Sequence, residues 1–203
     1  MIAERRNGRN ARIAETTRST KETDIKVKVN IDGSGEADIS TGLPFVNHII
    51  VSLAKHSMVD IRVLATSNDN IVHHLIEDTA ISLSHALDKA LGDRKYIARF
   101  GYAIVPMDDS LSIVSLDLIR RQYSKISLRL VNQLIEGIYK EDMEHFVRSL
   151  VENLNACVHI DVKYGENDHH KIESVIKAFA VALRMAVNVD FRRNDVPSTK
   201  GEM

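Results

Sequence analysis

Cysteine, tryptophan and proline are scarce in this 203-residue sequence, which contains one cysteine, no tryptophan and three prolines. The single thiol, Cys157, cannot form an internal disulfide, so we expect a reducing, cytoplasmic compartment. No segment approaches the roughly 18 apolar residues that a membrane-spanning helix needs. The formal net charge is −1, which predicts no general affinity for nucleic acid. The single cysteine argues against a disulfide-stabilised protein, the lack of a long apolar segment against a membrane-spanning protein, and the net charge against a strongly basic protein.

The remaining composition is that of an ordinary globular protein, with 44% hydrophobic and 27% charged residues. Residues 1–10 are rich in Arg and Asn and have no apolar core. We therefore expect residues 1–11 to form a flexible N-terminal tail rather than a secretory signal.

Hydrophobic periodicity predicts a mixture of strands and helices in both halves of the chain. Alternating residues predict strands, and apolar residues spaced three and four apart predict helices. In the first half we predict a hairpin of strands 24–31 and 36–40, a helix after Pro44, a strand over 59–65 and a helix over 74–91. In the second half we predict strands at 102–105, 111–118, 126–131 and 158–164 and helices at 142–154 and 170–187.

The two halves repeat each other. His145 follows His48 by 97 positions (145 − 48), and the pair beginning at His169 follows the pair beginning at His73 by 96 (169 − 73). One deletion in a loop therefore aligns the halves. The repeat predicts two similar α+β units, at 12–95 and 96–203, each with strands on one side and two helices on the other. Neither helix pair can bury itself alone, so the units should pack together as one body.

A His-His-x-x-Glu motif occurs once in each half. The two copies are His73-His74-Leu75-Ile76-Glu77 and His169-His170-Lys171-Ile172-Glu173. Residues three and four apart share a helix face, so the carboxylate of each copy neighbours both imidazoles. Adjacent imidazoles diverge by about 100°, so each pair is better shaped to serve two ions than to chelate one. The motif therefore predicts a dinuclear metal site.

The matching pair His48 and His145 adds two more imidazoles. Divided by the internal symmetry, the set supplies three His and one Glu to each ion. Nitrogen and oxygen ligands with open positions suit Mn²⁺, although Zn, Fe and Ni stay open by ligand type. A single His-His pair is usually a surface feature, but two copies with a matching Glu and a matching third His favour metal. His56 aligns with Asn153 and is interpreted as structural or as a substrate contact.

Several other polar residues are candidates for binding or catalysis. Ser198 and Lys200 lie in a Pro-Ser-Thr-Lys-Gly segment that could hold a phosphate through side chains and backbone N–H groups. Lys177 lies one turn beyond Glu173 and should point the same way as the metal residues. Arg99 and Arg121 are candidate anion ligands, and Glu15 and Asp108 are candidate catalytic carboxylates.

With these motifs in place, residues 12–203 resemble imidazoleglycerol-phosphate dehydratase, an enzyme family of histidine biosynthesis. The resemblance depends on these segments, in order: Glu15 with Thr20-Lys21-Glu22-Thr23; Thr41-Gly42-Leu43-Pro44-Phe45 with His48; His73-His74-x-x-Glu77-Asp78-Thr79; Leu91-Gly92-Asp93; Arg99-Phe100-Gly101; Pro106-Met107-Asp108; Leu116-Asp117-Leu118; Asn167-Asp168-His169-His170-Lys171-Ile172-Glu173; Lys177-Ala178-Phe179; and Pro197-Ser198-Thr199-Lys200-Gly201.

The resemblance implies a duplicated fold like that of ribosomal protein S5 domain 2, with a four-stranded sheet and two helices in each half. It implies two Mn²⁺ per active site and a large homo-oligomer, of 24 subunits in the family, with sites at subunit interfaces. By resemblance, the metal ligands are His48, His73, His74, Glu77, His145, His169, His170 and Glu173. The residues at family positions for the substrate phosphate are Arg99, Arg121, Lys177, Ser198 and Lys200. Glu15 falls where the family contacts the reacting carbons, and Asp108 falls at a position for proton handling.

The implied reaction is the dehydration of D-erythro-imidazole glycerol phosphate to imidazole acetol phosphate. The proton to be removed is weakly acidic. Metals at the ring nitrogens would favour an imidazolate and stabilise developing charge. That charge can delocalise into a diene-like intermediate as hydroxide leaves, with a carboxylate as general acid or base.

Three departures from the family pattern lie in the first half. Asn47 stands where the family has Asp, Ile71-Val72 stands where it has acidic residues, and Leu75 stands where it has Thr. Lost carboxylates would orient His48 and His73 less firmly and could weaken metal affinity by about 10–100-fold. One alternative is therefore a metal-binding paralogue whose activity has lapsed through these changes. A second alternative is a dinuclear phosphoesterase, since two metals and anion-binding groups would also serve hydrolysis.

Overall fold

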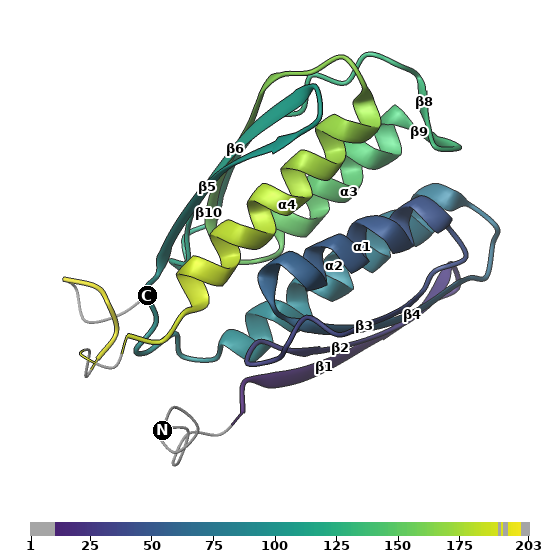
Figure 1. The fold of residues 1–203 in the computed structure, drawn as a ribbon. Coiled ribbons are helices and arrows are strands. Elements are labelled where there is room, and N and C mark those ends of the chain that lie inside the picture. Colours follow the sequence, from purple (N-terminus) through teal and green to yellow (C-terminus); the bar gives the residue numbers. More distant parts are fainter. Residues whose placement is uncertain (1–10, 191, 193–194, 200–203) are drawn as a thin grey trace.

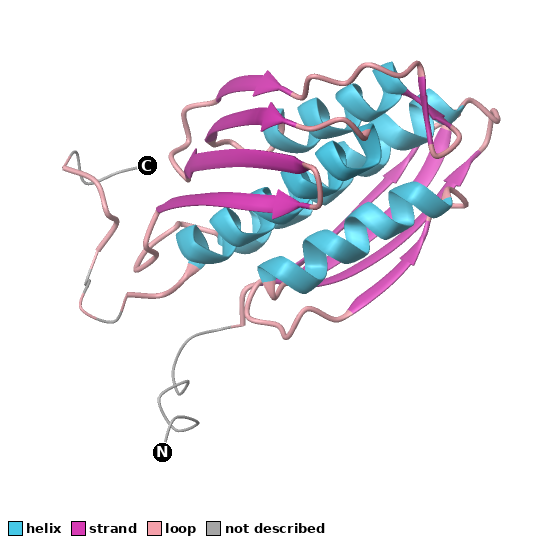
Figure 2. Ribbon diagram, turned by 45° about the horizontal axis from the view of Figure 1, so that its top comes forward, coloured by secondary structure: helices cyan, strands magenta, loops and turns pink. Residues whose placement is uncertain are grey.

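The computed structural model describes residues 11–190, 192 and 195–199. It has four layers, in which two four-stranded sheets lie on the outside and two helices line the inner face of each sheet. Figure 2 shows the helices between the two sheets. The mixed α+β fold predicted from the sequence is confirmed, with a four-stranded sheet in each half. None of the helices in the described part of the chain is both long and apolar enough to cross a membrane.

The first sheet is built from residues 13–67 in the order β1-β2-β4-β3. The elements of this half are β1 (Ile13–Ser19), β2 (Thr23–Asn30), β3 (Ala37–Ser40), α1 (Pro44–Ser57), β4 (Asp60–Ser67) and α2 (Val72–Leu91). The middle strand β2 alternates buried Ile25 and Val27 with exposed Lys26 and Lys28. This period of two gives the sheet one apolar face, which α1 and α2 cover.

The second sheet has the matching order β5-β6-β10-β7. Its elements are β5 (Phe100–Met107), β6 (Ser110–Asp117), β7 (Tyr123–Ser127), α3 (Lys140–Glu152), β10 (Cys157–Tyr164) and α4 (Asp168–Val187). A small hairpin of β8 (Leu134–Ile135) and β9 (Ile138–Tyr139) lies between β7 and α3 and has no counterpart in the first half. The bounds of α4 follow those of α2 by 96 positions (168 − 72 and 187 − 91), as the sequence repeat predicted.

The helices pack across the two halves, with α1 against α4 and α2 against α3. The apolar faces of all four helices are buried, with Ile49, Leu83, Phe146 and Phe179 at 1% exposure or less. Each helix pair packs one apolar face on its own sheet and has a second apolar face on the opposite side. The two helix pairs bury this second face against each other. The first turns of α2 and α4, which carry the two His-His pairs, are thereby brought against α3 and α1.

Two sequence predictions about the sheets are wrong. We predicted that strand 36–40 pairs with strand 24–31 as a hairpin, but β3 pairs with β4 in parallel. Both edges of β2 are already taken by the longer strands β1 and β4. We also predicted a strand over 126–131, but β7 ends at Ser127 and the chain then leaves the sheet. Strands β1, β8 and β9 were not predicted.

Candidate functional site

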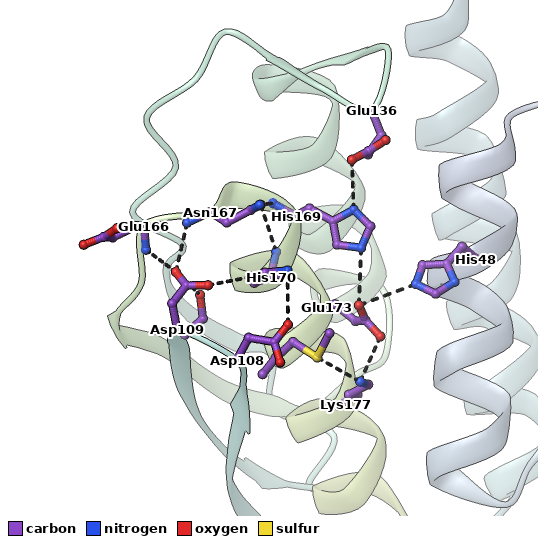
Figure 3. A network of polar contacts seen from close by, with 12 residues as sticks. His48, Asp108, Asp109, Glu136, Glu166, Asn167, His169, His170, Glu173 and Lys177 are labelled. Carbon is purple, nitrogen blue, oxygen red and sulfur yellow. Dashed lines mark hydrogen bonds and ion pairs between the residues drawn. The ribbon is translucent and has the colours of Figure 1, made fainter.

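The first candidate site lies where α1 meets α4, and we call His48, His169 and Glu173 the α1/α4 cluster. Each offers a ligand atom within 4.8 Å of the others. Glu173 Oε2 lies 3.3 Å from His169 Nε2 and 3.6 Å from His48 Nε2. Figure 3 shows His48 reaching across from α1 toward the carboxylate on α4. Pro44, Phe45 and Glu136 complete the wall of a cavity of about 340 Å³ at this cluster.

The second candidate site repeats this arrangement where α2 meets α3, and we call His73, Glu77 and His145 the α2/α3 cluster. Their ligand atoms also lie within 4.8 Å of one another. Glu77 Oε1 lies 3.1 Å from His145 Nε2, and Glu77 Oε2 lies 3.9 Å from His73 Nε2. The internal repeat therefore produces two clusters of two imidazoles and one carboxylate, and each cluster takes ligands from both halves.

In each cluster, one imidazole is oriented by a carboxylate that contacts its other ring nitrogen. His73 Nδ1 lies 2.7 Å from Asp142 of α3, and His169 Nδ1 lies 3.1 Å from Glu136 in the β8–β9 turn. Such an acceptor fixes the tautomer and aims Nε2 at the cluster, which is how proteins orient imidazole ligands for metal ions. The donor set and its orientation therefore fit a divalent ion in both clusters.

The two histidines of each pair contact different carboxylates. The ring planes of His73 and His74 make an angle of 67°, and those of His169 and His170 an angle of 83°. Sequence reasoning assigned three His to each ion, but a single chain brings only two His into each cluster. His74 and His170 lie outside both.

His74 and His170 are also bonded to carboxylates through Nδ1. Asp69 Oδ2 lies 2.7 Å from His74 Nδ1, and Asp109 Oδ1 lies 2.5 Å from His170 Nδ1. The bond to Asp69 raises the pKa of His74. The bond from His170, with N–H bonds from Asn167 and the residue before it, holds the pKa of Asp109 far below its ordinary range. Both imidazoles are therefore held in one orientation before any further ligand arrives.

Lys177 distinguishes the α1/α4 cluster from the α2/α3 cluster. Its Nζ lies 2.8 Å from Glu173 Oε1, on the side of the carboxylate that faces away from the imidazoles. Burial raises the pKa of Glu173, but the bond and charge of Lys177 and the charge of His48 outweigh it, so the pKa lies below its usual value. The equivalent position in the first repeat, 81 (177 − 96), is Ile81. Glu173 therefore has a cationic partner that Glu77 lacks at this position.

The other predicted residues divide between the two ends of the molecule. Asp108 lies close to the α4 pair, with Oδ2 3.4 Å from His170 Nε2. Arg99 lies at the opposite end of α4, where its backbone N–H donates to Ala186 and its guanidinium to Asp117 and Pro197. These contacts place Arg99 beside the segment that contains Ser198.

Glu15 is also far from the clusters of its own chain. Its carbonyl oxygen accepts from Lys89 Nζ, near the C-terminal end of α2. Lys89 follows His74 by 15 residues, which corresponds to roughly 22 Å along the helix. Arg121 is exposed in the loop after β6, and Lys200 lies outside the described residues. One chain therefore does not bring Glu15, Arg99 and Ser198 to its own histidines.

The departures from the family pattern have different structural consequences. Asn47 accepts from the N–H and hydroxyl of Thr41, so its amide holds the loop before α1. Where acidic residues were expected before the first His pair, Asp69 supplies the carboxylate for His74 from the same loop. The expectation that His73 is weakly oriented is wrong, because Asp142 takes that role.

Sequence reasoning missed all four carboxylates that hold the imidazoles. Asp69, Asp109, Glu136 and Asp142 lie in turns or at helix starts, and only one of them, Asp69, is within five residues of the His that it contacts. The available signal was general: an imidazole ligand usually has a carboxylate or carbonyl on its other nitrogen. That rule predicts that a partner exists, but not which residue it is.

Comparison with known proteins places the chain in a family. The family model for imidazoleglycerol-phosphate dehydratase matches residues 41–183. The chain is 42% identical to the imidazoleglycerol-phosphate dehydratase of Chloroherpeton thalassium over 94% of its own length and 97% of that protein. It is 46% identical to imidazoleglycerol-phosphate dehydratase 1, chloroplastic, of Arabidopsis thaliana, over 94% of this chain and 71% of that one.

The fold agrees with solved structures of the same family. The Staphylococcus aureus enzyme superposes with a TM-score of 0.79 at 29% identity, covering 88% of this chain and 99% of that one. The Pyrococcus furiosus enzyme, solved in complex with (S)-C348, gives 0.79 at 34% identity, covering 93% and 100%. With the two His-His-x-x-Glu motifs and both clusters in place, the chain belongs to the imidazoleglycerol-phosphate dehydratase family and is a dehydratase, an enzyme of the hydro-lyase class.

Proposed function

We propose that this chain dehydrates D-erythro-imidazole glycerol phosphate to imidazole acetol phosphate in the histidine pathway, with two Mn²⁺ ions in each active site. The observation that carries the proposal is the pair of matching clusters, each with two imidazoles and one carboxylate across a helix–helix contact. One imidazole of each cluster is oriented by a further carboxylate. The names of the relatives support the substrate. The cytoplasm, proposed from the single cysteine, is the expected compartment.

In this proposal the α1/α4 cluster holds one ion and the α2/α3 cluster holds the other. Each cluster supplies three ligands, which leaves positions open on a six-coordinate ion. When bound, the ions would hold the two nitrogens of the substrate ring and favour its deprotonated form. The protein's contribution is orientation, because Asp142 and Glu136 aim His73 and His169 and leave their Nε2 atoms facing the clusters.

The remaining ligands come from a second copy of the chain. His74 and His170 are oriented by carboxylates but lie outside both clusters of their own chain. Imidazoles held in this way are suited to complete the coordination of ions bound mainly by a neighbour. This supports assembly into a large homo-oligomer, proposed to have 24 subunits, with active sites at the interfaces.

The distribution of the other candidate residues supports the same assembly. α4 has 20 residues and is about 30 Å long, with His169 at one end and Arg99 bonded at the other. A phosphate held by Arg99, Arg121, Ser198 and Lys200 would therefore lie too far from the α1/α4 cluster of the same chain. In the assembled enzyme these groups, and Glu15, would face the clusters of a neighbour.

Asp108 and Lys177 are the candidate groups that lie beside the metal residues of their own chain. The exposed carboxylate of Asp108 is 3.4 Å from His170 Nε2, where it could accept or return a proton. Lys177 binds Glu173 in this structure and could turn toward the substrate phosphate when the ion neutralises that carboxylate. Glu15 would contact the carbons at which water is lost.

The direct test is turnover with defined metal. The purified chain, stripped of metal, should form imidazole acetol phosphate only after Mn²⁺ is added. Glu77→Ala and Glu173→Ala should each lower the bound Mn²⁺ from two ions per chain to about one and abolish turnover. Release of inorganic phosphate without dehydration would support a phosphoesterase instead. Metal binding and assembly without turnover would support the lapsed paralogue.

A mixing experiment tests the shared active site. Glu15→Ala and Glu173→Ala affect groups that we assign to the same active site but to different chains. Each variant alone should be inactive, whereas disassembled and remixed chains should recover part of the activity, because some sites receive both intact groups. Native mass measured in the same samples gives the subunit number. Inactive mixtures of normal native mass would contradict sites shared between chains.

A further inference from the structure

We infer that the buried ion pair of Asp168 and Lys171 is a positioning device for the α1/α4 cluster, acting through the loop at 129–132 and the β8–β9 hairpin. The inference rests on the proposed metal role of His169, which Glu136 of that hairpin orients. It assigns a role to Lys171, which lies inside the second His-His-x-x-Glu motif, and to Asp168, which precedes that motif; neither residue belongs to the cluster.

The ion pair is almost inaccessible to water. Lys171 Nζ lies 2.7 Å from Asp168 Oδ1, and their side chains are 3% and 2% exposed. Both residues lie in the first turn of α4, on either side of the His169-His170 pair. Charged groups are rarely buried this far unless they are paired and fully hydrogen-bonded. The remaining bonds of the pair therefore show what it holds.

Those remaining bonds go to the loop after β7. Asp168 Oδ2 accepts from the backbone N–H of Val131 at 2.9 Å and of Asn132 at 2.6 Å, and from Asn132 Nδ2 at 3.0 Å. Lys171 Nζ also donates to the carbonyl oxygen of Arg129 at 2.9 Å. The pair thus binds both the N–H groups and a carbonyl of one short segment, which fixes its backbone against α4.

The loop leads directly into the hairpin that contains Glu136. Lys140 donates its backbone N–H to Gln133, which closes the base of the hairpin. Glu136 and Gly137 both have positive φ, as the tight two-residue turn between β8 and β9 requires. Glu136 Oε1 then lies 3.1 Å from His169 Nδ1. The hairpin has only two residues in each strand, so it depends on its attachment to keep the carboxylate in place.

The first repeat carries an apolar pair at the same positions. Val72 and Leu75 align with Asp168 and Lys171 (168 − 96 and 171 − 96). That half has no hairpin between its edge strand and its next helix, and its His73 is oriented by Asp142 on a packed helix. The buried charges therefore occur in the half where a loop must be held. Buried ion pairs replaced by apolar residues often leave stability unchanged or improved, so a positioning role accounts for their presence better than stability alone.

The test transfers the apolar pair of the first repeat into the second. The variant Asp168→Val/Lys171→Leu removes both charges together, so it leaves no lone buried ion. We expect it to fold and assemble. The amides of residues 131–139 should exchange with deuterium at least tenfold faster, measured by mass spectrometry without metal. Mn²⁺ affinity of the α1/α4 cluster, titrated in a Glu77→Ala background, should fall by about 10–100-fold.

Two further variants distinguish a loss of positioning from a general loss of structure. Glu136→Gln should lower the same metal affinity while leaving amide exchange in residues 129–132 unchanged, because it removes only the last link. The exposed pair Asp93 and Lys95 is the matched control, and its Asp93→Asn/Lys95→Met variant should change neither readout. If the apolar swap does not fold, the near-isosteric Asp168→Asn/Lys171→Met is measured instead, with the same expectations.

The outcomes distinguish this inference from the proposed function. Unchanged exchange at 131–139 in the folded double variant would overturn the positioning role whatever the metal result. Faster exchange with unchanged Mn²⁺ affinity would also overturn it, because the hairpin would then not serve the cluster. If the unaltered chain binds no Mn²⁺, the proposed function fails, whereas the exchange result still reports on the loop.

Discussion

Lys177 should oppose metal binding at the α1/α4 cluster, so its removal should tighten that site. Its ammonium lies 2.8 Å from Glu173 Oε1, while Oε2 of the same carboxylate faces the two imidazoles. We therefore predict that Lys177→Met binds Mn²⁺ more tightly, although the substitution removes a group proposed to bind the substrate phosphate. The first repeat has Ile81 at this position, so the α2/α3 cluster should fill first in the unaltered chain.

The magnitude follows from the geometry of the carboxylate. The ammonium lies 2.8 Å from Oε1. The separation of the two carboxylate oxygens and the metal–oxygen bond add roughly 2.2 Å each, so a dication bound through Oε2 would lie within about 7 Å of the ammonium. At that distance charges of +2 and +1 repel by about 1.2 kcal/mol even at the dielectric constant of water. That corresponds to roughly sevenfold in the dissociation constant. Because a lysine can turn toward solvent, we expect a gain of roughly three- to tenfold.

The assay measures Mn²⁺ binding to the α1/α4 cluster alone, at a single pH. Calorimetric titration in a Glu77→Ala background leaves only the α1/α4 cluster to bind Mn²⁺. Without Lys177, burial would raise the pKa of Glu173 from its present lowered position. Measurement at about pH 8 keeps that carboxylate ionised in both proteins. Lys95→Met, which removes an exposed lysine beyond the far end of α2, is the matched control. Equal or weaker binding by Lys177→Met would refute the reasoning.

Three further predictions concern orientation, pH and packing. Asp142→Asn should weaken Mn²⁺ binding at the α2/α3 cluster by about 10–100-fold, because His73 loses the carboxylate on Nδ1, and calorimetry would show it. Asp109 has a depressed pKa, chiefly through His170, so it should stabilise the fold above its ordinary pKa of 3.8 and lose that effect as the pH falls below it. The stability difference between the unaltered chain and Asp109→Asn, from denaturant unfolding, should therefore shrink below pH 3.8. Gly101→Ala should lower the free energy of unfolding by about 1–3 kcal/mol in the same assay, since a Cβ would collide with the backbone of α4. An unchanged midpoint of unfolding would show that β5 can move to make room.

The sequence alone determined the features that are local or repeated. Apolar residues at helical spacing predicted α1, α2, α3 and α4, and the predicted bounds of α2, α3 and α4 lie within two residues of those observed. The matched offsets predicted that the two halves share one plan. Helical periodicity also placed each Glu beside its own His pair, because that relation depends only on residues four apart. The divergence of adjacent imidazoles followed from the same local geometry.

The tertiary structure decided which helices meet, and therefore which ligands share a cluster. Nothing in local periodicity specifies that α1 packs on α4 rather than on α2, so the grouping of His48 with Glu173, and of His145 with Glu77, came only from the packed helices. The same applies to the hairpin predicted for β2 and β3. Pairing there was decided by competition with β1 and β4, which offer longer registers.

The carboxylates that orient the imidazoles were also decided by tertiary structure. Asp142 reaches His73 across 69 residues of chain, and Glu136 reaches His169 across 33. Such contacts are set by where loops and helix ends lie after the core has packed, and they leave no periodic trace in the sequence. Sequence therefore predicted a metal site from its residue types, whereas only the packed structure could show how those candidate ligands are grouped and aimed.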